Sequence, residues 1–169
     1  MTETEQLIKG IEFLRKESNR ISGLIKNAEF RLNLIPGDET WTRIKKENEA
    51  QLAVITENLK NLYQKLFALK ATLGASVWQS TLVSLGTVIA STENINHVAN
   101  SLGDERDLNE AIDDTENAIV NVQQSLVNAD EDMQIILGAQ LEYYKNDMRQ
   151  HFWGEERLAK LITEDTPGR

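Results

Sequence analysis

The residues best suited to acid–base or metal chemistry form two pairs, each an acidic residue and a histidine. Glu93 and His97 are four residues apart, and so are Asp147 and His151. On a helix this spacing places both members of a pair on one face, and the two pairs together could hold a metal ion. Di-metal helical bundles instead project Glu-x-x-His repeats into the core, and this sequence has none. We interpret the pairs as solvated ion pairs, with partial packing of His151 as the alternative, and we expect no metal, no cofactor and no catalytic residue.

A second candidate for chemistry is an acidic cluster past the middle of the chain. Carboxylates bind magnesium when they converge on one point, but on a helix these side chains point in nearly every direction except that of the Leu108, Ile112 and Thr115 seam. Our first interpretation is therefore a solvated surface. The more specific hypothesis is a surface that docks a basic protein partner. The cluster consists of Asp104, Glu105, Asp107, Glu110, Asp113, Asp114 and Glu116.

The remaining composition excludes several classes of function. No glycine-rich phosphate loop, nucleophile elbow or zinc-ligand spacing occurs, so we expect no enzyme. The chain has no cysteine, which favours a reducing compartment, and its start, MTETEQLIKG, lacks the basic and apolar regions of a secretion signal. These features predict a cytoplasmic protein.

The net charge of −9 is unevenly distributed along the chain. Residues 1–75 hold twelve basic and ten acidic residues, a net charge of +2, whereas residues 76–169 hold six basic and seventeen acidic residues, a net charge of −11. No patch of Lys and Arg is dense enough to displace counterions from phosphates, so we expect no direct nucleic-acid binding.

Heptad spacing predicts that residues 1–73 form a long antiparallel helical hairpin, similar to a coiled coil. Pro36 and Gly37 suit the turn, and Asp38 or Thr40 can cap the second helix. The first seam consists of Leu7, Ile11, Leu14, Ser18, Ile21, Ile25, Ala28, Leu32 and Ile35. The second consists of Trp41, Ile44, Leu52, Ile55, Leu59, Leu62, Leu66, Leu69 and Leu73.

Two or three shorter helices are predicted for residues 74–163, which we expect to pack on the hairpin within the same domain. A third helix is predicted within residues 71–102, where Gly74 ends the preceding helix, Ser76 caps the new one and Gly103 breaks it. An acidic helix follows over residues 104–128. The segment NADEDMQ favours a break, with Asn128 or Asp130 capping a fifth helix, although one unbroken helix over 105–152 is the alternative. The fold class is therefore an all-α, elongated helical bundle with a disordered tail at 164–169.

The stretch at residues 71–92 carries no charged side chain. Its apolar residues fill one arc of the helix, and small hydroxyl side chains fill another beside it, so both sides need cover. The helix is then the core of a monomeric bundle, a face buried between copies, or a segment that inserts into a membrane. We assign the self-association contact to Ser76, Trp78, Ser80, Ser84, Leu85, Thr87 and Ser91.

Together these features predict a non-enzymatic helical assembly protein. It forms a homo-oligomer through the uncharged helix at 71–102 and presents the acidic helix at 104–128 to a protein partner, for which basic chemistry is the natural fit. Two alternatives come from other classes: a membrane-active protein that inserts residues 71–92, and an acidic inhibitor that mimics nucleic acid and blocks a basic channel.

Overall fold

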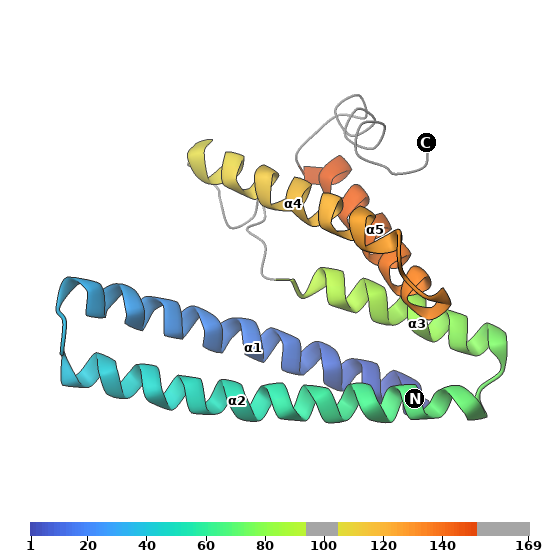
Figure 1. Ribbon diagram of the computed structural model, residues 1–169, viewed down its shortest axis with the longest axis horizontal. Coiled ribbons are helices and arrows are strands. Elements are labelled where there is room, and N and C mark those ends of the chain that lie inside the picture. The colour runs from blue at the N-terminus through green and yellow to red at the C-terminus, as the bar shows by residue number, and fades with distance from the viewer. Residues whose placement is uncertain (94–104, 152–169) are drawn as a thin grey trace. The chain divides into compact units, whose positions relative to one another are not determined.

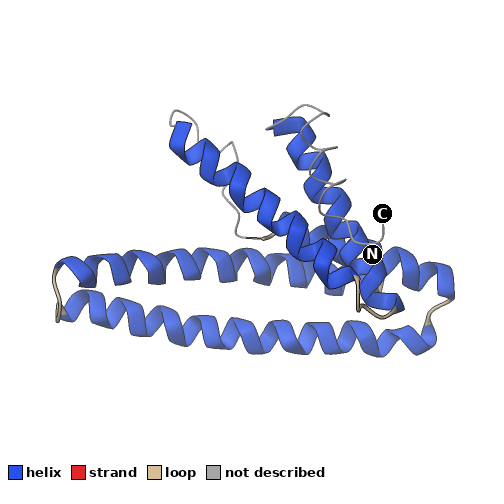
Figure 2. Ribbon diagram, turned by 45° about the horizontal axis from the view of Figure 1, so that its top comes forward, coloured by secondary structure: helices blue, strands red, loops and turns tan. Residues whose placement is uncertain are grey.

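The computed structural model describes residues 1–93 and 105–151, with side chains for 1–93 and 116–146. Within these ranges every regular element is a helix, which confirms the all-α prediction (Figures 1 and 2). The chain divides into two compact units, Met1–Leu73 and Gly74–Arg169. The elements are α1 (Glu3–Leu34), α2 (Glu39–Ala68), the 3-10 helix η1 (Leu69–Thr72), α3 (Ala75–Ser91), α4 (Glu105–Leu126) and α5 (Glu131–His151).

The first unit is a hairpin whose two helices begin at side-chain caps. Thr2 and Glu5 form a capping box at the start of α1, in which the Glu5 amide donates to Thr2 Oγ1 at 3.2 Å. At the turn Gly37 has φ of 81°, a left-handed conformation that glycine adopts without strain. The Asp38 carboxylate then accepts a hydrogen bond from the Trp41 amide at 3.1 Å. The predicted turn and the Asp38 cap are therefore confirmed.

Contacts along the hairpin fix its antiparallel register. Near one end, a Cβ on Gly10 would lie 3.2 Å from Leu62 Cδ1. Near the other, the Arg31 guanidinium lies 5.5 Å from the centroid of the Trp41 ring. Residues early in α1 thus face residues late in α2, and the two helices run side by side along their length (Figure 1).

The predicted seams lie between the two helices, but most of their side chains are only half-buried. Ile11, Ile21 and Ala28 of α1 and Leu66 of α2 are buried. Two parts of the prediction are wrong. Ile35 is 60% exposed because it is the residue that caps the end of α1, and α2 ends at Ala68 because residues 69–72 tighten into η1. Supercoiled packing of a coiled-coil type stays a prediction.

In the second unit α5 packs against both α3 and α4. The core contains the buried residues Ala90, Ile119, Val122, Leu137 and Tyr144. α5 approaches α3 closely at Gly86, where an added Cβ would clash with the Ile136 carbonyl oxygen and lie 2.8 Å from Ala139 Cβ. Only glycine leaves room for this backbone contact.

The bounds of the later helices correct one prediction and confirm another. α3 covers Ala75–Ser91 rather than 71–102, and its N-cap is Gly74 rather than Ser76, because the Gly74 carbonyl accepts the first helical hydrogen bond, from the Trp78 amide at 2.9 Å. The predicted break is present between α4 and α5, where Asp130 Oδ1 accepts from the Met133 amide at 2.8 Å. The predictions for residues 94–104 and 152–169, including the tail, lie outside the described residues.

Candidate interaction surfaces

The acidic and histidine residues singled out in the sequence do not form a reactive site in the part of the chain that the structure describes. In that part of the chain, no group of three or more acidic or histidine side chains could hold a metal ion. Glu93 is exposed beyond the end of α3. His97 and the side chains of Asp147 and His151 lie outside the described residues.

A membrane-spanning helix is likewise not found within residues 1–93 and 105–151, since none there combines the required length and hydropathy.

One side of α3 belongs to the buried interior. Trp78, Thr81, Leu82, Leu85, Gly86 and Ala90 are all buried. Trp78 also donates a hydrogen bond from its indole nitrogen to Asp132 Oδ1 of α5 at 3.2 Å. Of the seven residues assigned to self-association, Trp78 and Leu85 therefore lie in the interior, at 5% and 1% exposure, and cannot offer a surface to another molecule.

The opposite side of α3 is exposed and carries no charge, and we call it the outer face of α3. Val77 and Val83 are 49% and 48% exposed. The other members are Ser76, Ser80, Ser84 and Thr87, all exposed, with the half-buried Ser91 at the end. Thr87 and Ser91 donate their hydroxyl hydrogens to the carbonyl oxygens of Val83 and Val88, at 3.0 and 3.1 Å. Because these two hydroxyl groups already donate hydrogen bonds within the helix, the face is less polar than its composition implies.

A groove of about 450 Å³ adjoins this outer face and runs between α3 and α5. Val83 and Thr87 line it from α3, and Ile135, Gly138, Ala139 and Tyr143 line it from α5. Its polar edge consists of Gln134, Glu142 and Asn146. An added Cβ on Gly138 would meet nothing within 4 Å, so the groove is open above that residue.

The acidic cluster cannot be assembled as a surface from the described side chains. Asp104 lies outside the described residues, and Glu105, Asp107, Glu110, Asp113 and Asp114 lie on α4 where only the backbone is described. Glu116 is half-buried. The docking of a basic partner on this cluster therefore stays a prediction.

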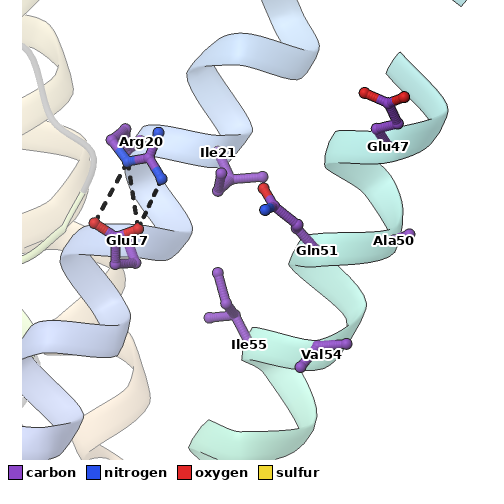
Figure 3. Close-up of a pocket in the computed structure, with 8 residues that line it drawn as sticks. All are labelled: Glu17, Arg20, Ile21, Glu47, Ala50, Gln51, Val54 and Ile55. Carbon is purple, nitrogen blue, oxygen red and sulfur yellow. Dashed lines mark hydrogen bonds and ion pairs between the residues drawn. The ribbon is translucent and has the colours of Figure 1, made fainter. Parts of the chain in front are cut away.

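The hairpin carries a surface that sequence reasoning missed, a groove of about 430 Å³ on one of its faces. Ile21 and Ile55 point toward the facing helix at its base, with Glu17 and Arg20 along α1 and Glu47, Ala50 and Val54 along α2 (Figure 3). It was missed because most of these residues lie beside the heptad seam. The signal available in the sequence was apolar residues off the seams, among them Phe13, Leu24 and Val54, which are 63%, 40% and 61% exposed.

The charges at this groove are fixed by a short ion pair. Arg20 donates hydrogen bonds from Nη2 and Nε to the Glu17 carboxylate, the shortest at 2.8 Å (Figure 3). These hydrogen bonds, and secondarily the charge of Arg20, hold the pKa of the Glu17 carboxyl below its ordinary value. Glu17 therefore stays ionised beside the groove through the neutral pH range.

The fold defines an all-α protein made of helical units. Beyond that class the comparisons assign nothing, since no protein family model, no curated protein and no solved structure matches the chain.

Proposed function

We propose that this protein is a non-enzymatic helical assembly protein whose copies associate through the outer face of α3. The observation that carries the proposal is an exposed helix face with two half-exposed valines and no charge, in a half of the chain with a net charge of −11. Apolar side chains exposed together on a polar surface are typical of contacts with other proteins.

A second copy is the partner that this face suits best. Each copy carries a net charge of −9, so two copies repel least where neither presents a charge. The face is also self-complementary in antiparallel order. A two-fold axis near Val83 and Ser84 places Ser80 opposite Thr87 of the second copy, and Ser76 opposite Ser91.

The small side chains favour a close approach of the two helices. Serine, threonine and glycine at a helix contact let the backbones come near each other and bury the valines between them. The groove between α3 and α5 extends the contact surface, because Gly138 leaves open space beside Val83. In the same proposal the acidic helix at 104–128 is left to bind a basic protein.

Substituting Ser84 with lysine tests the proposal. Near a two-fold axis the two introduced ammonium groups face each other, so we expect the association constant to fall by at least about tenfold, or about 1.4 kcal/mol. Light scattering behind a sizing column measures the change in molar mass.

Ser125→Lys is the matched control. Ser125 is, like Ser84, an exposed serine within a helix, and its hydroxyl donates to the Asn121 carbonyl at 2.9 Å. It should leave the mass unchanged. Equal masses for the Ser84→Lys variant and the unmodified chain would contradict the assignment of the contact to α3.

A further inference from the structure

A row of two charged residues flanked by two apolar residues follows the edge of the hairpin groove along α1. Phe13, Glu17, Arg20 and Leu24 are spaced four, three and four residues apart, which places them on one stripe of the helix. Glu17 and Arg20 line the groove, and Phe13 and Leu24, at 63% and 40% exposure, continue the stripe on either side of them.

This stripe is complementary to itself when reversed. The midpoint between Glu17 and Arg20 is also the midpoint between Phe13 and Leu24. If a second α1 lies antiparallel across this midpoint, each Glu17 faces an Arg20 and each Phe13 faces a Leu24. Farther out, the exposed Arg31 lies opposite the exposed Gln6, which brings no like charges together.

A matching stripe on α2, made of Ala50, Val54 and Asn58, is symmetric about the same height along the hairpin. Val54 lines the groove across from the Glu17 and Arg20 pair and is 61% exposed. Ala50 and Asn58 lie four residues to either side of it, and both are exposed. A two-fold axis through the groove therefore places Val54 against the Val54 of the second copy, with uncharged residues on both sides.

We propose that this groove face is a second self-association surface, on which the hairpins of two copies pack antiparallel into a four-helix arrangement. Charge complementarity identifies the occupant as another copy, because Glu17 and Arg20 each face the opposite charge on the reversed stripe. The hairpin's net charge of only +2 adds little repulsion. The half-buried seams of α1 and α2 gain the cover that two helices alone do not provide. This contact is independent of the outer face of α3.

Disulfide cross-linking tests the proposed axis, since the chain has no cysteine of its own. The experiment uses the full-length chain with Ser84→Lys in place, so that the outer face of α3 contributes nothing. Val54→Cys should form a covalent dimer on mild oxidation, because two Cβ atoms at the axis can approach to about 4 Å. Leu24→Cys should stay monomeric, because the two copies of residue 24 lie about 16 Å apart along the helix at 1.5 Å per residue.

An equimolar mixture of the Phe13→Cys and Leu24→Cys variants should form the mixed dimer that neither forms alone. Failure of both Val54→Cys and this mixture to cross-link would overturn the proposal. Cross-linking of Leu24→Cys alone to the same extent as Val54→Cys would overturn it too, because it would show that the copies meet in no fixed register. Neither result bears on the α3 contact, which the Ser84→Lys comparison tests separately.

A charge exchange tests the complementarity itself. In the chain that carries Ser84→Lys, Arg20→Glu should weaken the hairpin contact by about tenfold or more, because Glu17 then faces a carboxylate of the second copy. Adding Glu17→Arg to Arg20→Glu should restore it, since the stripe is again complementary to itself. Glu12→Lys, which removes the Glu12 and Lys16 ion pair from α1 outside the groove stripe, is the matched control and should have no effect. Absence of rescue by the double exchange would contradict the proposed pairing.

Discussion

At the scale of single residues, two glycines of the second unit have opposite roles. Gly86 is buried and its missing side chain lets α5 approach α3, whereas Gly138 lies in a helix with open space beside it. The residue type is the same, so the sequence alone does not distinguish them. Only the position of the facing helix decides which glycine the core requires.

Gly86→Ala should therefore destabilise the protein, while Gly138→Ala should not. The methyl group on residue 86 forces α3 and α5 apart, and overpacking of this kind costs about 1–3 kcal/mol. At residue 138 the change should stabilise the helix by about 0.5–1 kcal/mol, because alanine restricts the unfolded chain more than glycine does. Urea unfolding followed by circular dichroism measures both, and an equal effect of the two variants would contradict the close contact at Gly86.

The Glu17 carboxyl should titrate below the ordinary range of a glutamate. Its pKa is lowered in the folded chain by the hydrogen bonds from Arg20, so the pair contributes stability above the ordinary glutamate pKa and loses it as pH falls through the lowered value. Carbon-13 NMR of the side-chain carboxyl measures this pKa directly. Arg20→Gln should raise it toward the ordinary value, and an unchanged titration in that variant would show that Arg20 is not the cause.

At the scale of elements, much of the helix pattern is predictable because its causes are local. Asp38 and Asp130 cap helices where polar side chains follow a turn, and the seam of α1 is buried at Ile11, Ile21 and Ala28 as its spacing predicts. Helix ends set by backbone groups were harder to predict. Gly74 caps α3 with its carbonyl alone, and η1 replaces the last turn of α2 without any breaking residue.

The candidate surfaces were predicted only in part, because they depend on which sides of each helix other elements cover. The sequence identified the small hydroxyl residues of α3, but it also assigned Trp78 and Leu85 to the contact. Both are large and apolar, and only the packed unit reveals that they are already buried. The hairpin groove depends on the register between α1 and α2, which is a long-range property that heptad spacing does not fix.

Removing the cap of α2 should destabilise the hairpin. Asp38→Ala leaves the Trp41 amide without its side-chain acceptor and should lower the free energy of unfolding by about 1 kcal/mol. Asp38→Asn retains an acceptor oxygen and should lower the free energy of unfolding by a few tenths of a kcal/mol at most. Thermal unfolding of the two variants against the unmodified chain measures the difference, and an equal loss in both would contradict capping by the side-chain oxygen.

At the scale of the whole molecule, the two units differ in charge and offer different surfaces. The hairpin combines both signs of charge around an apolar groove, whereas the second unit concentrates negative charge and leaves α3 uncharged. Two independent contacts on one chain allow assemblies larger than a dimer, closed or open according to the angle between the axes. In this proposal assembly thus uses both halves of the sequence.

The two contacts should respond to salt in opposite directions. Raising ionic strength from about 0.01 M to about 0.15 M shortens the Debye length from about 30 Å to about 8 Å. Arg20→Glu isolates association through α3 and changes the net charge from −9 to −11. Screening weakens the repulsion between these negatively charged copies, so their association should strengthen. Association through the hairpin, isolated by Ser84→Lys, should weaken because it uses ion pairs. Sedimentation velocity measures both, and weakening of both by salt would argue against an uncharged α3 contact.

The central claim is that copies of this chain associate with one another, and the molar mass of the unmodified chain in solution tests it most directly. Light scattering behind a sizing column at moderate salt, over a series of protein concentrations, measures that mass. We predict a multiple of the 19.1 kDa chain mass that declines on dilution. A mass of 19.1 kDa at every concentration would contradict self-association through either surface.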